Sequence, residues 1–214
     1  MKKIIEIYKE YKIMPMLAMH QMRVAAVAME IADSFDTGID KESIVKACLL
    51  HDMGNIIKFH LERNPEWNEP LGTEYWQSVK DEYILLYGNH EHHASLKIAK
   101  ALGMSTYTIE LINCIDASHI EKITDEDDFC KKICIYVDNR VSPHGIVSVE
   151  EHSLDSHKRY MNHPHAFSEE SRLNFNKNLN KIENQIFSHT KIKPEDINDD
   201  SIKKYLDKLE NTII

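Results

Sequence analysis

The chain has 214 residues, of which 42% are hydrophobic, and a formal net charge of −9. This length suffices for one sizeable core, and the acidic balance argues against a protein that coats nucleic acid or binds membranes through a polybasic surface. No apolar run is long enough to span a membrane and no signal-peptide cleavage site follows the N-terminus, so we expect a cytoplasmic protein.

The first strong helical pattern runs from Pro15 to about Asp33, with the proline in the first turn. Its apolar stripe consists of Leu17, His20, Val24, Val27 and Ile31. His20 therefore takes an inward position where a leucine would be expected.

A second helix is predicted after Asp40, a candidate N-cap, and Gly54 is a plausible stop. Its inward stripe ends at His51, which is followed directly by Asp52 in the run "IVKACLLHDMGN". A carboxylate on a buried face costs several kcal/mol unless a positive charge meets it. The pair therefore either faces water or contacts a cation.

Residues 59–80 change in character, because they contain two prolines, a glycine and both tryptophans. We interpret this segment as a loop or lid. Its aromatic residues Trp67, Tyr75 and Trp76 either stack against a nucleobase or anchor the loop to the core. The helical pattern returns near Tyr83, breaks at "YGNHEHHAS" and resumes up to Gly103, with His90 at a helix N-terminus.

A further helix from Ser105 would place Ile112, Ile115 and His119 on one stripe. In the next helical pattern Asp138 follows Cys130 and Cys134 at intervals of four, so this carboxylate also lies on an apolar face. The four cysteines of the chain lie in apolar helical patterns and form no C-x-x-C pair, so buried free thiols are expected. They are Cys48, Cys114, Cys130 and Cys134.

The sequence beyond residue 150 begins with an irregular segment that contains His152, His157, His163 and His165. Two amphipathic helices follow, one through Leu173, Leu179, Ile182 and Ile186 and one through Ile202, Tyr205 and Leu209. No convincing run of alternating strands occurs, which predicts an all-α fold. We expect a metal-binding helical domain over residues 1–150 and a helical extension, packed on it, over residues 151–214.

Polar side chains thus interrupt the apolar faces of four separate helices, and His90 adds a fifth element. The residues are His20, His51 with Asp52, His119 and Asp138. A single inward histidine is more often a hydrogen-bonded core residue than a metal ligand, but four such positions together favour a metal site. Imidazole and carboxylate without thiolate are ligands for iron, manganese, cobalt, nickel or zinc in hydrolytic or redox sites.

The order and spacing of these residues resemble the HD-domain superfamily of metal-dependent phosphohydrolases. The matching positions are His20 in "MHQMRVAAVAMEIA", His51–Asp52 in "LLHDMGN" and Asp138 in "IYVDNRVSPHG". Arg23, three residues after the first histidine, matches as well, and the resemblance covers about residues 15–145. It implies a helical bundle around one or two divalent ions, with iron, manganese, cobalt, nickel, zinc or magnesium as candidates.

Two-metal members of the superfamily carry two further histidines between the His-Asp pair and the last aspartate. The segment "NHEHHASLKIAKALG" resembles the first of these regions, with His90 the best match and His93 the next. In the second region, His119 lies slightly later in the sequence than the usual spacing of the superfamily predicts, and Asp116 lies nearer to that spacing. Many members also have Gly-Lys after the pair, where this chain has Gly54–Asn55 and then Lys58.

The resemblance implies hydrolysis of a phosphoester or phosphoanhydride in a small phosphorylated substrate, with a nucleotide as the favoured class. Asp52 would be a metal ligand central to catalysis, and Arg23, Lys58 and Arg140 are candidates for holding the phosphate. Lys158 and Arg159 with His163 could complete the pocket. Whether the protein forms a homodimer stays open.

Two other functions remain as alternatives. One is a dinuclear iron oxygenase of the same superfamily, which would need a redox-active pair of ions. The other is a non-catalytic sensor that binds a nucleotide or a metal and signals through the C-terminal helices.

Overall fold

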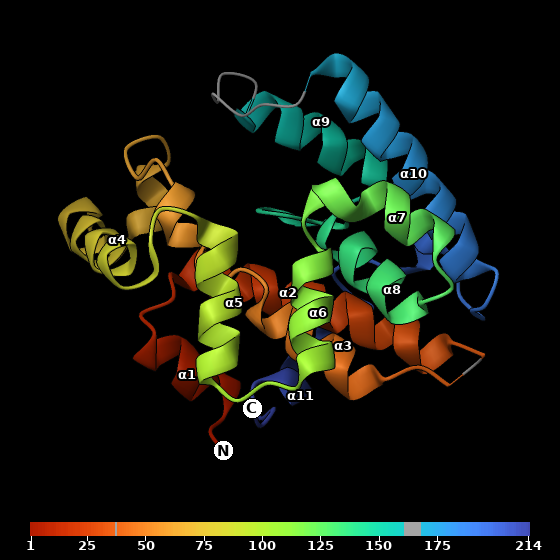
Figure 1. The fold of residues 1–214 in the computed structure, drawn as a ribbon, viewed down its shortest axis with the longest axis horizontal. Helices are drawn as coiled ribbons and strands as arrows, with labels where there is room; N and C mark the ends of the chain where they lie inside the picture. Colours follow the sequence, from red (N-terminus) through yellow and green to blue (C-terminus); the bar gives the residue numbers. More distant parts are fainter. Residues whose placement is uncertain (37, 161–167) are drawn as a thin grey trace.

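The computed structural model describes residues 1–36, 38–160 and 168–214, and the regular secondary structure of this part consists of helices and one small hairpin (Figure 1). The α-helices are α1 (Ile4–Glu10), α2 (Pro15–Ser34), α3 (Lys41–Leu50), α4 (Thr73–Tyr87), α5 (Glu91–Ala101), α6 (Thr106–Cys114), α7 (Ile120–Asp125), α8 (Phe129–Asp138), α9 (Val149–Tyr160), α10 (Glu169–Phe187) and α11 (Lys203–Leu209). The 3-10 helices are η1 (Asn55–Lys58), η2 (Pro65–Asn68), η3 (Ala117–His119) and η4 (Pro194–Asp196). Strands β1 (Val141–Ser142) and β2 (Gly145–Ile146) pair antiparallel. The all-α prediction is confirmed.

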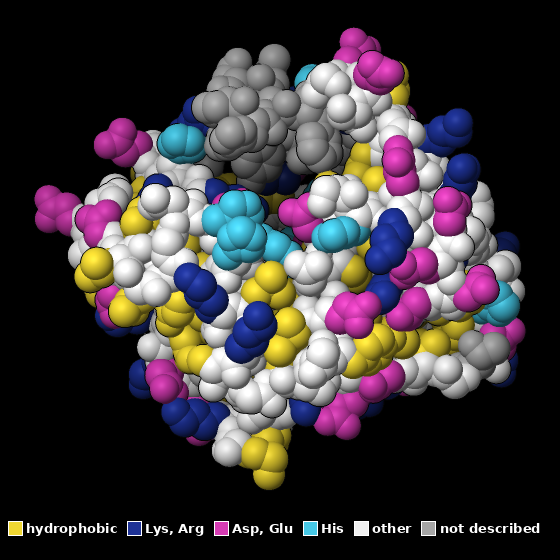
Figure 2. Space-filling view, in the orientation of Figure 1, with side chains coloured by type: hydrophobic (Ala, Val, Ile, Leu, Met, Phe, Trp, Pro, Cys, Tyr) yellow, Lys and Arg dark blue, Asp and Glu magenta, His cyan; other side chains and the backbone are white. Residues whose placement is uncertain are grey.

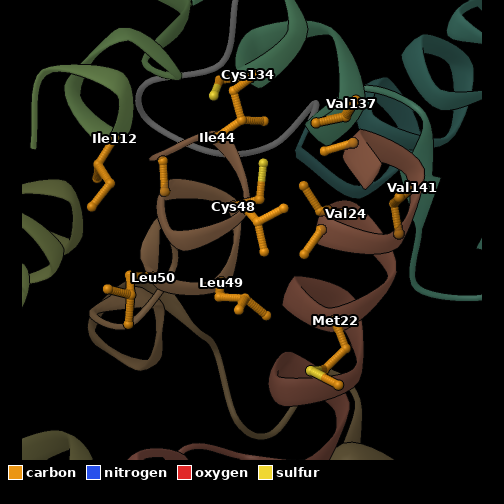
Figure 3. Close-up of a cluster of buried hydrophobic side chains, with 14 of the residues drawn as sticks. Met22, Val24, Ile44, Cys48, Leu49, Leu50, Ile112, Cys134, Val137 and Val141 are labelled. Carbon is orange, nitrogen blue, oxygen red and sulfur yellow. The ribbon is translucent and has the colours of Figure 1, made fainter. Parts of the chain in front are cut away.

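Helices α2, α3, α6 and α8 pack against one another and form the centre of the molecule. Their apolar stripes meet there, because residues three and four apart lie on one face of a helix. Figure 3 shows this cluster, to which α2 contributes Val24, α3 Ile44 and Cys48, α6 Ile112, and α8 Cys134 and Val137. The packing fixes α2, the end of α3 and α8 relative to one another, and these segments carry His20, His51 and Asp138.

Side-chain caps define where several of these helices begin. Asp40 accepts from the backbone N–H of Ser43 (3.0 Å), which confirms it as the N-cap of α3. Asp128 accepts from the N–H groups of Cys130 and Lys131 (3.0 and 3.2 Å) at the start of α8. Such caps stabilise a helix by about 1 kcal/mol each. Both helices that deliver ligand-type residues at their C-terminal ends are therefore fixed at their N-terminal ends.

The C-terminal helices pack on the helices that precede them. Helix α10 lies against α7 and α8, α11 lies against α2, and α9 contacts β1 and α10. The two chain ends lie side by side, because Lys3 and Ile213 form an isolated β-bridge (Figure 1). The boundary at residues 150 and 151 stays a prediction.

The prediction of a loop or lid over residues 59–80 is wrong for the second half of that segment. Helix α4 begins at Thr73, and Trp76, Val79 and Tyr83 are buried on one of its faces. The indole N–H of Trp76 donates to the carbonyl of Asn68 (3.0 Å), so this tryptophan anchors η2 to α4. Prolines and glycine before Thr73 dominated the sequence pattern and concealed the helical spacing of these three residues.

The helix predicted from Ser105 ends earlier than expected, so His119 does not share its stripe. Helix α6 stops at Cys114, and Asp116 accepts from the N–H of Ser118 (2.9 Å) to start the 3-10 turn that contains His119. A local carboxylate–backbone bond of this kind competes with helix continuation.

The described segment that follows residue 150 is helical rather than irregular, because α9 covers Val149–Tyr160. His152 and His157 lie on α9, whereas His163 and His165 lie outside the described residues. The two later amphipathic helices match α10 and α11, although Leu173 is exposed.

All four cysteines are free and buried, as predicted. Within the described ranges, no helix combines the length and apolar character needed to cross a bilayer.

Candidate metal centre

Two imidazoles and two carboxylates converge where α2, the turn after α3 and the end of α8 meet. His20 Nε2 lies 3.1 Å from Asp138 Oδ1 and 3.7 Å from Asp52 Oδ2. His51 Nε2 lies 3.2 Å and 3.6 Å from the same two oxygens. The ligand atoms of His20, His51 and Asp52 all lie within 4.8 Å of one another. Four ligand-type groups from three segments are therefore brought to one point.

The orientation of His51 is fixed by a backbone carbonyl. Its Nδ1 lies 2.8 Å from the oxygen of Cys48, one turn earlier in α3. A carbonyl oxygen can only accept, so Nδ1 carries the proton and donates. In a neutral ring the lone pair is then on Nε2, which faces both carboxylates, and this is the arrangement in which a histidine binds a metal.

The charges of the cluster perturb one another strongly. Burial by itself would lower the pKa of His51, but the carboxylates of Asp52 and Asp138 outweigh it and raise the pKa to about 10. Burial would raise the pKa of Asp138, but His51 and His20 hold it well below its ordinary value. The proton on His51 thus offsets part of the charge of the two carboxylates. A divalent cation could replace that proton, and two nitrogen and two oxygen donors suit such an ion.

A buried glutamine supports the turn that carries Asp52. The backbone N–H of Asp52 donates to Gln21 Oε1 (3.2 Å), and the Gln21 side chain is fully buried. Gln21 follows His20 directly on α2, so one short segment positions both an imidazole and the turn opposite it.

A second group of polar side chains lies between α5 and the end of α6. His92 Nε2 lies 3.3 Å from Asn113 Oδ1, and the amide nitrogen of Asn113 lies 3.4 Å from His119 Nε2. Burial would raise the pKa of Asp116, but its bonds from Ser118 and the charges of His92 and His119 lower it. The charge of Asp52 in turn acts on His92, so this second group adjoins the first. His119 and Asp116, the two alternatives for the later ligand, therefore lie in one cluster.

His90 is placed differently from His92. It is the N-cap residue of α5, and its ring stacks on that of His93 at 4.2 Å, with both side chains exposed. Histidines gather near the centre of the face shown in Figure 2, over the neighbouring ends of α5 and α6. His92 was not among the residues selected from the sequence. It lies three residues before Ser95 and seven before Ala99, both buried, so the helical stripe of α5 contains the signal that identifies it.

The three candidate phosphate-binding cations lie in different environments. Arg23 is half-buried on α2, one turn after His20, and Lys58 is half-buried at the end of η1. Arg140 is buried, and its guanidinium donates to Val147 O (2.5 Å), Tyr136 Oη (2.5 Å), Pro194 O (3.0 Å) and Ile197 O (3.3 Å). Through these bonds Arg140 holds the hairpin and η4 together. Because its guanidinium is buried and donates to these acceptors, the expectation that it contacts a phosphate is corrected.

The cations expected to complete the pocket lie on α9. Lys158 is exposed, whereas Arg159 is half-buried and pairs with Asp155 (Nε–Oδ2 2.8 Å). Their expected companion His163 lies outside the described residues.

Comparison with known families adds an independent observation. A family model described as HD domain matches residues 17–136, more than half of the chain. The chain belongs to the HD domain family. Comparison with curated proteins and with solved structures gave no match.

The matched segment contains His20, His51 and Asp52, and it ends two residues before Asp138. The HD family is of the metal-dependent hydrolase type and binds divalent metals. The three residues whose geometry could hold a metal ion therefore lie within the matched segment.

Proposed function

We propose that this protein is a metal-dependent phosphohydrolase in which His20, His51, Asp52 and Asp138 hold a divalent ion. The observation that carries the proposal is the approach of both Nε2 atoms to both carboxylates within 3.7 Å. Membership of the HD family supports hydrolysis as the reaction type.

A bound divalent ion would supply a water that is acidic enough to act as a nucleophile, and positive charge for the phosphoryl oxygens. The residues of the chain do the rest. His51 is held through its Nδ1–H, so its lone pair keeps a fixed direction. Arg23, on the same helix as His20 and half-buried, would donate charge-assisted hydrogen bonds to a phosphoryl oxygen, and Lys58 would add a second positive charge.

The group around Asn113 is the proposed place of a second ion. His90 and His119 are the ligands implied by resemblance to two-metal members, with Asp116 as the alternative to His119. The half-burial of His92, its position 3.3 Å from Asn113 and the action of the Asp52 charge on it add His92 to the candidates. Measurement of metal content in alanine variants of these four residues would identify those that bind the ion.

The proposed substrate is a small phosphorylated molecule, with a nucleotide as the favoured class. The carboxylate and imidazole ligands are also compatible with a dinuclear iron oxygenase, which would consume oxygen together with an organic substrate. A sensor without catalysis is less favoured, because all four ligand-type residues of the first cluster are present.

A panel of phosphoesters and phosphoanhydrides tests the proposal. Untagged protein would be depleted of metal, reloaded with manganese, cobalt or iron, and assayed for phosphate release. We expect release from at least one nucleotide, dependent on the added ion. Oxygen uptake without phosphate release would favour the oxygenase instead, and binding without either reaction would favour the sensor.

A further inference from the structure

The hairpin after α8 turns the chain back toward the C-terminal end of α8, which carries Asp138. Strands β1 and β2 pair antiparallel, and the N–H of Val147 donates to the carbonyl of Arg140 (2.9 Å). Asp138 and Val149 each lie two residues from this bonded pair. Helix α9 therefore begins beside the end of α8, and Val149 is buried there.

From Val149 a half-buried polar stripe continues along one face of α9. It contains His152, Ser156 and Arg159, at helical spacing, while Glu151, Leu154, His157 and Lys158 are exposed. On an adjoining face Ser153 accepts from the amide of Asn176 on α10 (2.7 Å), which fixes the rotation of α9. A half-buried face that is polar rather than apolar lines a polar site more readily than it packs on a core.

His152, the first residue of this stripe, is close enough to the metal centre to be affected by its charges. The charges of Asp138 and His20 both act on the imidazole of His152. Burial is the main cause that lowers the pKa of His152. An imidazole offers at least one N–H donor in either protonation state.

We infer that His152 contacts the substrate at the metal centre and donates a hydrogen bond to its phosphoryl group. This inference rests on the proposed function. Helix α9 lies outside the segment that matches the HD domain. In this chain a helix C-terminal to the matched segment would therefore line one side of the substrate site. The stripe then leads from the phosphoryl group toward Arg159, which Asp155 holds in place.

Paramagnetic relaxation tests the position of His152 without any assay of activity. Protein labelled with ¹⁵N-histidine would be loaded with manganese, and zinc-loaded protein would give the diamagnetic reference. We expect manganese to broaden the ring signals of His152, assigned with a His152→Gln variant. His189 is the control, because its ring stacks on Phe35, fifteen residues and about 22 Å along α2 from His20. Equal, weak broadening of His152 and His189 would overturn the inference.

Binding of inorganic phosphate to the zinc-loaded protein tests the contact itself. We expect His152→Gln to weaken phosphate binding about tenfold or more, which is the loss of affinity expected when a hydrogen bond to a charged group is removed. The metal content should stay unchanged. His157→Gln, on the exposed face of the same helix, should leave the affinity unchanged. Unaltered affinity in His152→Gln, loss of metal from that variant, or a wild type that binds no phosphate would each overturn the inference. Failure of every substrate in the panel, with the His152 effect on phosphate intact, would instead contradict only the proposed function.

Discussion

At the scale of single residues, Asp52 is the group whose removal is most informative. Its carboxylate faces both imidazoles, and its backbone is held separately by Gln21. We expect Asp52→Ala to reduce retained metal below about a tenth of the wild-type content and to abolish hydrolysis, because a ligand and a charge are lost together. The helices should remain formed, since the carboxylate and its counter-charge leave as a pair.

Circular dichroism, metal content and turnover would be measured on one preparation. Asp207→Ala, an exposed carboxylate on α11, is the matched control and should behave as wild type. Hydrolysis by a metal-free Asp52→Ala protein would show that the cluster is not the catalytic centre.

The raised pKa of His51 predicts how pH affects the metal-free protein. The folded pKa of about 10 lies above the ordinary value of 6.5, so proton binding by this group stabilises the fold. That contribution is complete below pH 6.5 and is lost as the pH rises toward 10. Thermal unfolding of chelator-treated protein should therefore show a melting temperature that falls over this range.

The same proton should leave when a metal binds, so metal affinity should rise with pH over the same range. In His51→Gln both dependences should become weaker. A melting temperature of the metal-free wild type that rises between pH 6.5 and 10 would contradict the charge balance described for the cluster.

At the scale of secondary-structure elements, Gly54 sets how closely η1 approaches α5. A Cβ at this position would lie 2.2 Å from the carbonyl oxygen of Glu91 and 2.6 Å from the Cβ of Ala94. The N–H of Gly54 also donates to Ser95 Oγ (2.9 Å). We expect Gly54→Ala to destabilise the protein by about 1–3 kcal/mol, as overpacking does, and to shift α5 with its histidines.

Urea unfolding and metal stoichiometry would measure both effects. Gly38→Ala is the control, because no atom lies within 4 Å of a Cβ built at that position. Equal stability of the two variants would mean that η1 and α5 can separate at little cost.

Arg140 connects three elements, and its replacement should affect stability rather than chemistry. It donates to carbonyls next to β2 and around η4. We expect Arg140→Ala to lower the free energy of unfolding by about 3 kcal/mol, because several buried acceptors lose their donor. At a temperature where the variant stays folded, its metal content and phosphate affinity should match those of wild type. Weakened phosphate affinity in the folded variant would restore the binding role first expected for this residue.

At the scale of the whole molecule, the positions that the sequence predicted well are those set by long apolar stripes. His20 and Asp138 interrupt regular helical periodicity, and His51 ends another stripe, so their convergence follows once α2, α3 and α8 pack together. The HD family match covers α3 completely, and α2 and α8 except for two residues at one end of each.

Features set by local turns or by distant contacts could not be predicted in this way. His119 left its expected stripe because Asp116 caps a new turn, and Arg140 is committed to carbonyls more than fifty residues away. The inner face of α9 is polar, so it carries no hydrophobic periodicity. The sequence shows His152 only as one of several histidines, and its relation to Asp138 follows from the hairpin that joins α8 to α9.

Binding of one ion by His20, His51, Asp52 and Asp138 would be measured directly by anomalous X-ray diffraction from manganese-loaded crystals. We expect an anomalous peak about 2.0–2.3 Å from the Nε2 atoms of His20 and His51 and from carboxylate oxygens of Asp52 and Asp138. A peak elsewhere in the molecule, or manganese-saturated crystals with no peak at this point, would contradict it.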